Sequence, residues 1–182
     1  MVRLKGGDSY VFGRGYEELL ACAQAGVPVT VVPGVTSAFA VPAVAGVPVT
    51  HRGVAHEVVV VSGHVGPQDE RSLVDWNALA RLRGTIVLLM GLQRIEAFAK
   101  ALIGGGRPAE TPVLVVADGT MRTERVVRST LDEVAEVVAA QPTVCGTRNG
   151  SGSGTRGVPD SAGNVDRRVT ARTQLRSPRF HT

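Results

Sequence analysis

The chain has 182 residues, 43% of them hydrophobic and 20% charged, which is an ordinary globular composition. Its formal net charge of +4 is unevenly distributed: residues 1–141 carry 13 Lys and Arg against 14 Asp and Glu, whereas residues 142–182 carry seven Arg against two Asp. Because the excess of basic residues belongs to the last segment alone, the charge does not indicate a folded nucleic-acid-binding surface.

Composition also limits the location and the chemistry. Two cysteines, Cys22 and Cys145, are too few for a disulfide framework, and no metal-ligand spacing is visible, so we expect no metal site. The longest apolar run, residues 38–49, is too short to span a bilayer and contains two prolines. The charged amino terminus lacks the apolar core of a targeting signal. We therefore expect a cytoplasmic protein without membrane or nucleic-acid partners.

The first part of the chain, residues 1–52, is interpreted as the remnant of an amino-terminal α/β domain. Apolar residues at 1–4 and a β-branched run at 29–32 indicate strands. Each strand runs through a glycine-rich turn into a helix, and the helices are expected at 16–25 and 38–45.

The second part, residues 53–141, is interpreted as a carboxy-terminal α/β domain. Strands are expected at 58–62, 85–90 and 112–117, with a further extended segment at 123–130. Helices are expected at 75–82, 94–103 and 131–140. Because strands alternate with helices, we expect a largely parallel sheet with both faces covered.

The last segment, residues 142–182, has no periodic apolar face and is rich in Gly, Ser, Thr and Arg. Such a composition cannot bury enough surface to offset its ordering entropy, so we predict disorder. The abrupt change after a well-patterned helix suggests a shift of reading frame in the gene. An apolar strand in the neighbouring frame would support that hypothesis.

Three glycine-containing turns follow predicted strands and carry the functional prediction. They are Gly6-Gly7-Asp8, Met90-Gly91 and Asp118-Gly119. Ligands of open α/β sheets bind beyond the carboxyl ends of the strands, where these turns are expected. Glycines let a ligand approach the backbone closely, and the Asp8 carboxylate can accept hydrogen bonds from it. A tight surface turn without a ligand is the alternative interpretation of Asp8.

Side chains near these turns also have two interpretations each. Thr36 and Ser37 can bond a ligand, but a helix N-cap explains them equally well. Met90 can pack against an adenine or a thioether, although a methionine at a strand end is more often part of the core. Arg14, between two glycines, and Arg52, after an apolar segment, are either solvated charges or anchors for a carboxylate.

Several segments match one known family in order and spacing over roughly residues 2–140. They are Val2-Arg-Leu-Lys-Gly-Gly-Asp8, Phe12-Gly-Arg-Gly15, Val32-Pro-Gly-Val-Thr-Ser37, Gly46-Val-Pro-Val-Thr-His-Arg52, Ser62-Gly-His64, Leu89-Met-Gly-Leu92 and Asp118-Gly-Thr120. With them the chain resembles the uroporphyrinogen-III C-methyltransferases of the tetrapyrrole methylase superfamily.

The resemblance implies a tetrapyrrole methylase-like α/β fold of two domains, usually a homodimer, with the first domain incomplete here. It implies S-adenosyl-L-methionine as methyl donor in the interdomain cleft and S-adenosyl-L-homocysteine as product. The implied substrate is uroporphyrinogen III, methylated on two pyrrole carbons to give precorrin-2 for sirohaem and cobalamin. The implied cofactor contacts are Gly6, Gly7, Asp8, Val11, Thr36, Ser37, Met90, Ala117 and Gly119. Candidate partners of the substrate carboxylates are Arg14, Arg52 and Lys5.

The sequence also departs from the family pattern. Family members carry a Gly-x-Gly-Pro-Gly-Asp loop and proposed proton-transfer residues in a part of the pattern that would lie before Met1, so the catalytic residues are left unassigned. Ser9 stands where proline is usual, and Tyr16 where glycine is common. Two alternatives stay open: a truncated, non-catalytic remnant, and another precorrin methylase. Nucleic-acid binding through the arginines is disfavoured, because no aromatic residues are interleaved with them.

Overall fold

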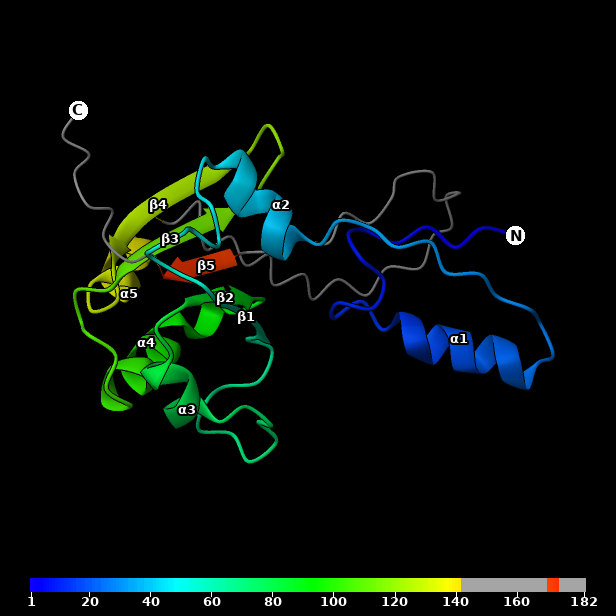
Figure 1. Ribbon diagram of the computed structural model, residues 1–182, viewed down its shortest axis with the longest axis horizontal. Helices are drawn as coiled ribbons and strands as arrows, with labels where there is room; N and C mark the ends of the chain where they lie inside the picture. Colours follow the sequence, from blue (N-terminus) through cyan, green and yellow to red (C-terminus); the bar gives the residue numbers. More distant parts are fainter. Residues whose placement is uncertain (142–169, 174–182) are drawn as a thin grey trace, which may run out of the picture.

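The computed structural model describes residues 1–141 and the backbone of residues 170–173, and it contains a five-stranded sheet with the order β1-β2-β5-β3-β4 (Figure 1). The strands are β1 (Val58–Ser62), β2 (Thr85–Leu89), β3 (Pro112–Ala117), β4 (Arg125–Thr130) and β5 (Thr170–Thr173). The helices are α1 (Gly15–Gln24), α2 (Ser37–Val44), α3 (Trp76–Arg81), the 3₁₀ turn η1 (Leu92–Arg94), α4 (Ile95–Gly104) and α5 (Val134–Ala139).

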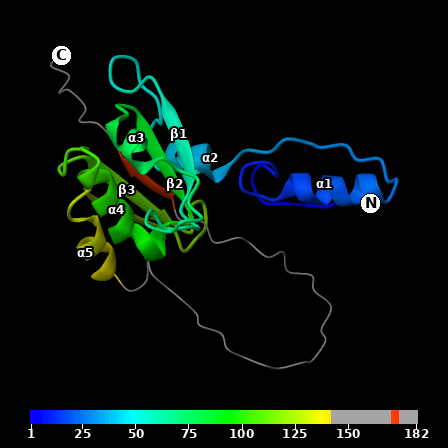
Figure 2. The ribbon, with the colours of Figure 1, turned by 90° about the horizontal axis from the view of Figure 1, so that it is seen from below.

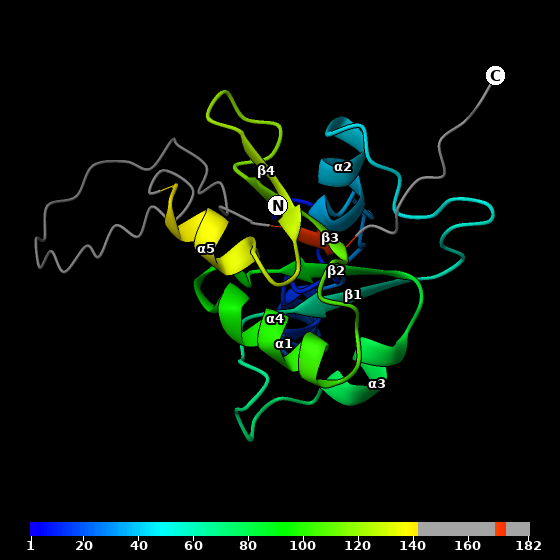
Figure 3. The ribbon, with the colours of Figure 1, turned by 90° about the vertical axis from the view of Figure 1, so that its left-hand side faces the viewer.

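Helices cover both faces of the sheet. Figure 3 shows α3, α4 and α5 on one face and α2 on the other. In Figures 1 and 2, α1 stands apart from the sheet, on a long excursion of residues 1–35. The elements expected within 58–141 are confirmed, and β1 and β3 have the predicted bounds. The expected division of the chain at residue 52 stays a prediction.

The apolar run of β3 is buried on both faces of the sheet. Because side chains alternate along a strand, Val113 and Val115 join the cluster beneath α3, α4 and α5, whereas Leu114 and Val116 join the cluster beneath α2. Burial on both faces explains why this strand is continuously apolar rather than alternating. The larger cluster includes an aromatic pair, Trp76 and Phe98, with ring centroids 5.0 Å apart; its members make the main core.

The expected parallel sheet is wrong in most of its pairings. β1 pairs with β2 in parallel, but β3–β4, β2–β5 and β3–β5 are antiparallel. The segment between β3 and β4 is only a short turn, and a parallel pair would need a crossover of a dozen or more residues. The alternation of strands and helices misled the prediction, because β4 has no helix before it.

The expectation of disorder for residues 142–182 is wrong for Thr170–Thr173. The backbone of this segment forms β5 and pairs with β2 on one side and β3 on the other. Without it both strands would leave a row of N–H and C=O groups unpaired, and backbone pairing needs no apolar side-chain pattern. The rest of that expectation, and Cys145, lie outside the described residues.

The strands expected at 1–4 and 29–32 are wrong as well. Both segments are extended but have no ladder partner among the described residues; Met1 is fully exposed, and Leu4 and Val32 are 86% and 81% exposed. A strand exists only with a partner, so the β-branched run of the second segment is not sufficient.

Within the described part of the chain, the helices are all too short or too polar to cross a membrane.

Candidate ligand-binding site

Asp8 joins two of the predicted glycine turns. One carboxylate oxygen accepts a hydrogen bond from the Tyr10 N–H at 2.9 Å, and the other accepts one from the Gly34 N–H at 3.0 Å. These bonds stabilise the charged form, so the Tyr10 N–H first and the Gly34 N–H second hold the pKa of Asp8 below its ordinary value of 3.8. A half-buried carboxylate therefore ties the turn at residues 6–8 to the turn at residues 33–34.

Gly34 is required by this contact. A Cβ at residue 34 would lie 2.0 Å from the Gly7 carbonyl oxygen, far inside van der Waals contact. Gly7 itself has a φ of +72°, a conformation that glycine adopts without strain. The sequence-based site included Gly7 but missed Gly34, although the Pro33-Gly34 turn after the β-branched run was visible.

The turn at Gly34 leads directly to the start of α2. Thr36 is the N-cap, is 6% exposed, and accepts a hydrogen bond from the Ala38 N–H through its hydroxyl at 3.3 Å. The Ser37 hydroxyl is buried and has no hydrogen-bond partner in the part of the chain that the structure describes. Since buried polar atoms are normally paired, Ser37 has an unused capacity to bond a ligand.

A non-glycine residue with a left-handed backbone conformation follows β2, and another follows β3. Met90, directly after β2, has a φ of 59°, and Asp118, directly after β3, has a φ of 51°. Such conformations are uncommon for these residue types and are concentrated at functional sites. The half-buried Met90 also packs with Ala38 and Leu89, as the core interpretation of this residue expects.

α2 brings these two strand ends together with the glycine turns. Its Ala38 packs in the same cluster as Met90, and its Val41 faces the loop after β3, where a Cβ on Gly119 would come within 2.7 Å of the Val41 methyl groups. Ala117, at the end of β3, is 7% exposed. The expected cofactor residues Thr36, Ser37, Met90 and Gly119 thus lie on or beside one short helix, whereas the Ala117 side chain belongs to the cluster on the opposite face of the sheet.

The loop that follows β3 is held by side chains that the sequence reasoning missed. Asp118 accepts a hydrogen bond from the Thr123 hydroxyl at 2.9 Å, and Glu124 accepts one from the Thr120 N–H at 2.6 Å. Thr120 has a φ of 73°. These two bonds fix the strained turn beside α2, and acidic residues after a strand end were the available signal for them.

The remaining expected cofactor residues lie in the first turn of the chain. Gly6 is exposed, and Val11 is half-buried with its N–H donating to the Asp8 carbonyl at 3.4 Å. Their roles toward a ligand stay predictions. The expectation that the proton-transfer residues of the family pattern fall before Met1 also stays a prediction, and the catalytic residues remain unassigned.

Two of the three cations expected to bind substrate pair with acids of α1, and the third lies in a separate bend of the chain. Lys5 pairs with Glu18 at 2.8 Å and is only 17% exposed, whereas Arg14 pairs with Glu17 at 2.5 Å and is 82% exposed. Both acids belong to the first turn of α1, where a negative charge favours the helix dipole. Arg52 is exposed in the bend between His51 and Ala55, away from these pairs in the chain.

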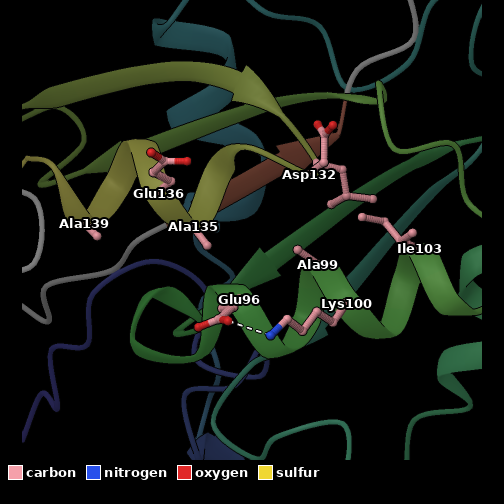
Figure 4. Close-up of a pocket in the computed structure, with 9 residues that line it drawn as sticks. Glu96, Ala99, Lys100, Ile103, Asp132, Ala135, Glu136 and Ala139 are labelled. Carbon is pink, nitrogen blue, oxygen red and sulfur yellow. Dashed lines mark hydrogen bonds and ion pairs between the residues drawn. The ribbon is translucent and has the colours of Figure 1, made fainter.

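Two hollows lie elsewhere. One is a surface groove of about 380 Å³ between α4 and α5, on the sheet face opposite α2 (Figure 4). The other is a void of about 30 Å³ inside the main core. None of the expected site residues lines either hollow. Among residues 1–141, no three His, Cys, Asp or Glu side chains are grouped closely enough to hold a metal ion.

The arrangement is that of an α/β protein with a candidate ligand site beside α2 and the ends of β2 and β3. Comparison with known proteins defines its class. The family of tetrapyrrole (corrin/porphyrin) methylases matches residues 1–135. The chain belongs to this family.

Within the family, the chain is similar to curated proteins of known function. The chain is 47% identical over 137 residues to the S-adenosyl-L-methionine-dependent uroporphyrinogen III methyltransferase of Methanosarcina barkeri, covering 75% of this chain and 54% of that protein. It is 46% identical over 143 residues to siroheme synthase 1 of Pectobacterium atrosepticum, covering 79% of this chain and 29% of that protein. The chain therefore spans about half the length of the first relative and less than a third of the second.

Solved structures give the same class and confirm the expected tetrapyrrole methylase-like α/β fold. The uroporphyrin-III C-methyl transferase of Thermus thermophilus, complexed with S-adenyl homocysteine, matches 95% of this chain and 65% of that chain, with 37% identity and a TM-score of 0.67. The cobalt precorrin-4 methyltransferase shares the fold at 22% identity, with a TM-score of 0.72 over 92% of this chain and 61% of that chain.

Proposed function

We propose that this chain binds S-adenosyl-L-methionine and supplies the cofactor half of an enzyme that C-methylates uroporphyrinogen III to precorrin-2, for sirohaem or cobalamin. The observation that carries the proposal is the clustering of three chain-distant turns, at 6–8, 90–91 and 118–119, around α2 and its leading turn at 33–34. The functions of the Methanosarcina barkeri and Thermus thermophilus relatives support this choice. S-adenosyl-L-homocysteine would be the other product.

The residues at the site fit this cofactor. When bound, it supplies an electrophilic methyl group that an electron-rich pyrrole carbon can attack, without a metal or a protein nucleophile. The chain's task is then to align the two reactants and exclude water. Gly6 and Gly7 allow close approach to the backbone, Asp8 accepts hydrogen bonds, and the buried, unpartnered Ser37 hydroxyl supplies a further polar contact.

Apolar groups complete the proposed cofactor site. Val11, Met90 and Ala117 are half-buried or buried. Their side chains carry no charge and so do not repel the positively charged sulfonium of the cofactor. Thr36 holds the start of α2, and Gly119 keeps the loop after β3 against that helix. All of them position the cofactor in this proposal, and none acts as a general acid or base.

The cations proposed to bind the substrate carboxylates are ranked by how exposed their side chains are. Arg14 and Arg52 are exposed, and a guanidinium can bond a carboxylate through two N–H groups, so they are the stronger anchors. Lys5 is the weaker one, because its side chain is only 17% exposed. A homodimer in the cytoplasm remains the expected state of the intact enzyme.

A second function, binding without turnover, is favoured by one observation. Val2, Leu4 and Val32 are each more than 80% exposed on segments with no strand partner among the described residues. Exposed apolar segments of this kind mark a surface that a whole enzyme covers. In this alternative the chain is a non-catalytic remnant that binds the cofactor alone. Another precorrin methylase is the third alternative.

Calorimetric titration of the full chain with S-adenosyl-L-homocysteine tests the cofactor site. We expect a Kd on the order of 10–100 μM, and no heat at about 1 mM would overturn the proposal. Gly34→Ala should weaken binding about tenfold, because its Cβ forces the turns at 6–8 and 33–34 apart. Gly104→Ala, where a Cβ meets nothing within 4 Å, is the matched control and should bind like the wild type.

An assay of methyl transfer to uroporphyrinogen III then separates the two functions. Binding together with transfer supports the enzyme, whereas binding without transfer supports the remnant. Transfer only to a later precorrin would identify the third alternative.

A further inference from the structure

The groove between α4 and α5 has no role in the proposed cofactor site. We define the α4–α5 groove by the residues that line it: Glu96, Ala99, Lys100, Ile103, Leu131, Asp132, Ala135, Glu136 and Ala139. Its apolar members form the floor, and its three acidic members and one lysine form the rims (Figure 4).

The groove is acidic overall. Lys100 is the one cation among its lining residues, and its ammonium group is already paired with Glu96 at 2.6 Å. Asp132 and Glu136 are exposed along α5 and its lead-in, and neither forms an ion pair within the described residues. An occupant that complements this groove carries positive charge at its edges and apolar side chains for the floor.

The last residue of β5 lies at the same end of the strands as one end of the α4–α5 groove. Thr173, its last residue, pairs with Val113 at the start of β3, and the neighbouring Pro112 pairs with Thr130 at the end of β4. From there the chain continues into the lead-in to α5, where the Asp132 N–H donates to the Ala109 carbonyl. Thr173, the last described residue of β5, therefore lies near the end of the groove that contains Asp132.

The nine residues after β5 have the length and the chemistry of the occupant. Residues 174–182 read Gln-Leu-Arg-Ser-Pro-Arg-Phe-His-Thr, with two arginines, no acid and two large apolar side chains. Nine extended residues reach about 30 Å, whereas the ten residues of α4 span about 15 Å. The segment is long enough to follow the whole groove.

We propose that residues 174–182 dock in the α4–α5 groove of the same chain. In this arrangement Arg176 and Arg179 face the carboxylates of Asp132 and Glu136, and Leu175 and Phe180 cover the apolar floor. Docking would anchor the far end of β5 and so favour its insertion between β2 and β3. The occupant is this chain's own terminus, because the segment begins beside the groove and complements its charge.

Disulfide trapping in the full chain tests the proposal, in a background that carries Cys22→Ser and Cys145→Ser. One cysteine is placed in the groove by Ala135→Cys and one in the segment by Ser177→Cys. The control pair combines Ser177→Cys with Arg122→Cys, an exposed site in the turn at the opposite end of β3. Under mild oxidation at micromolar protein, we expect the groove pair to close within one chain about tenfold faster than the control pair.

Charge variants make the test specific. Asp132→Lys with Glu136→Lys should slow closure of the groove pair about fivefold, and adding Arg176→Glu with Arg179→Glu should restore it. The milder Asp132→Asn with Glu136→Gln serves if the lysine variant does not fold. Equal rates for the two cysteine pairs, closure only between chains, or rates that ignore the charge reversals would each overturn the proposal.

Discussion

Asp8 illustrates how one residue serves both the fold and the candidate site. Its carboxylate accepts hydrogen bonds from the Tyr10 and Gly34 N–H groups, and so it closes one turn and attaches a second. The contact works only because Gly34 has no side chain, since a Cβ there would overlap the Gly7 carbonyl. The glycines of the two turns and the hydrogen bond from Gly34 to Asp8 thus have one cause, the close approach of two backbone segments.

The hydrogen bonds to Asp8 predict how the contact responds to acid. They lower the pKa of Asp8 in the folded chain below its ordinary value of 3.8, so the charged contact contributes stability above about pH 3.8. That contribution is lost as the pH falls through the lower, folded value. The Gly34 amide resonance, followed by NMR, should therefore titrate with a midpoint below 3.8.

The control for this titration is Asp8→Asn, which keeps a hydrogen-bond acceptor but does not ionise. The Gly34 amide of this variant should show no titration between about pH 2 and 5. A wild-type midpoint at or above 3.8 would contradict the expected contact.

At the scale of elements, α2 is the helix on which the candidate site depends. Its side chains reach the loop after β3 through Val41 and the end of β2 through Ala38. The helix has only eight residues and contains Pro42, which removes one backbone donor from its interior. Such a short helix has little intrinsic stability, so its cap and its packing must hold it.

Loss of the cap should therefore weaken α2. Thr36→Ala removes the side-chain acceptor for the Ala38 N–H and should lower the free energy of unfolding by about 1 kcal/mol. Urea unfolding followed by circular dichroism measures the change. Thr36→Ser keeps the hydroxyl and should lose less than half as much, and equal losses for the two variants would show that the cap is not responsible.

At the scale of the whole molecule, β5 joins two halves of the sheet. On one side it pairs with β2, which leads to β1, and on the other with β3, which leads to β4. Backbone bonds across these two ladders are the direct connection between the strand pairs. The order of the sheet therefore depends on a segment some thirty residues beyond α5 along the chain.

A proline in β5 tests this dependence. Ala171 pairs with Leu88 on one side and Val115 on the other, and Ala171→Pro removes the backbone donor of the central strand. We expect the free energy of unfolding to fall by about 3 kcal/mol, measured in urea. Ala171→Ser keeps the N–H and should unfold close to the wild type; an unchanged proline variant would contradict the placement of β5.

The sequence was sufficient for elements whose signals are local. The apolar runs of β1 and β3 predicted their bounds, because four or more consecutive β-branched or aliphatic residues favour a strand. β3 is buried on both faces, whereas β1 is mostly half-buried. Side-chain chemistry limited the N-cap to Thr36 or Ser37, and the structure has Thr36 in that position. Family membership also followed from sequence, because its motifs are short turns whose residues are set by local backbone geometry.

Pairing between distant segments required the tertiary structure. The β-branched run at 29–32 has the composition of a strand but lies unpaired among the described residues, whereas the polar segment Thr170–Thr173 forms the central strand. Which segment joins a sheet depends on where open strand edges meet in space, and backbone groups pair without regard to side-chain pattern. The meeting of Asp8 with Gly34, 26 residues apart, was decided in the same way. Sequence determined the turns and the family; only the folded chain determined which turns share one site.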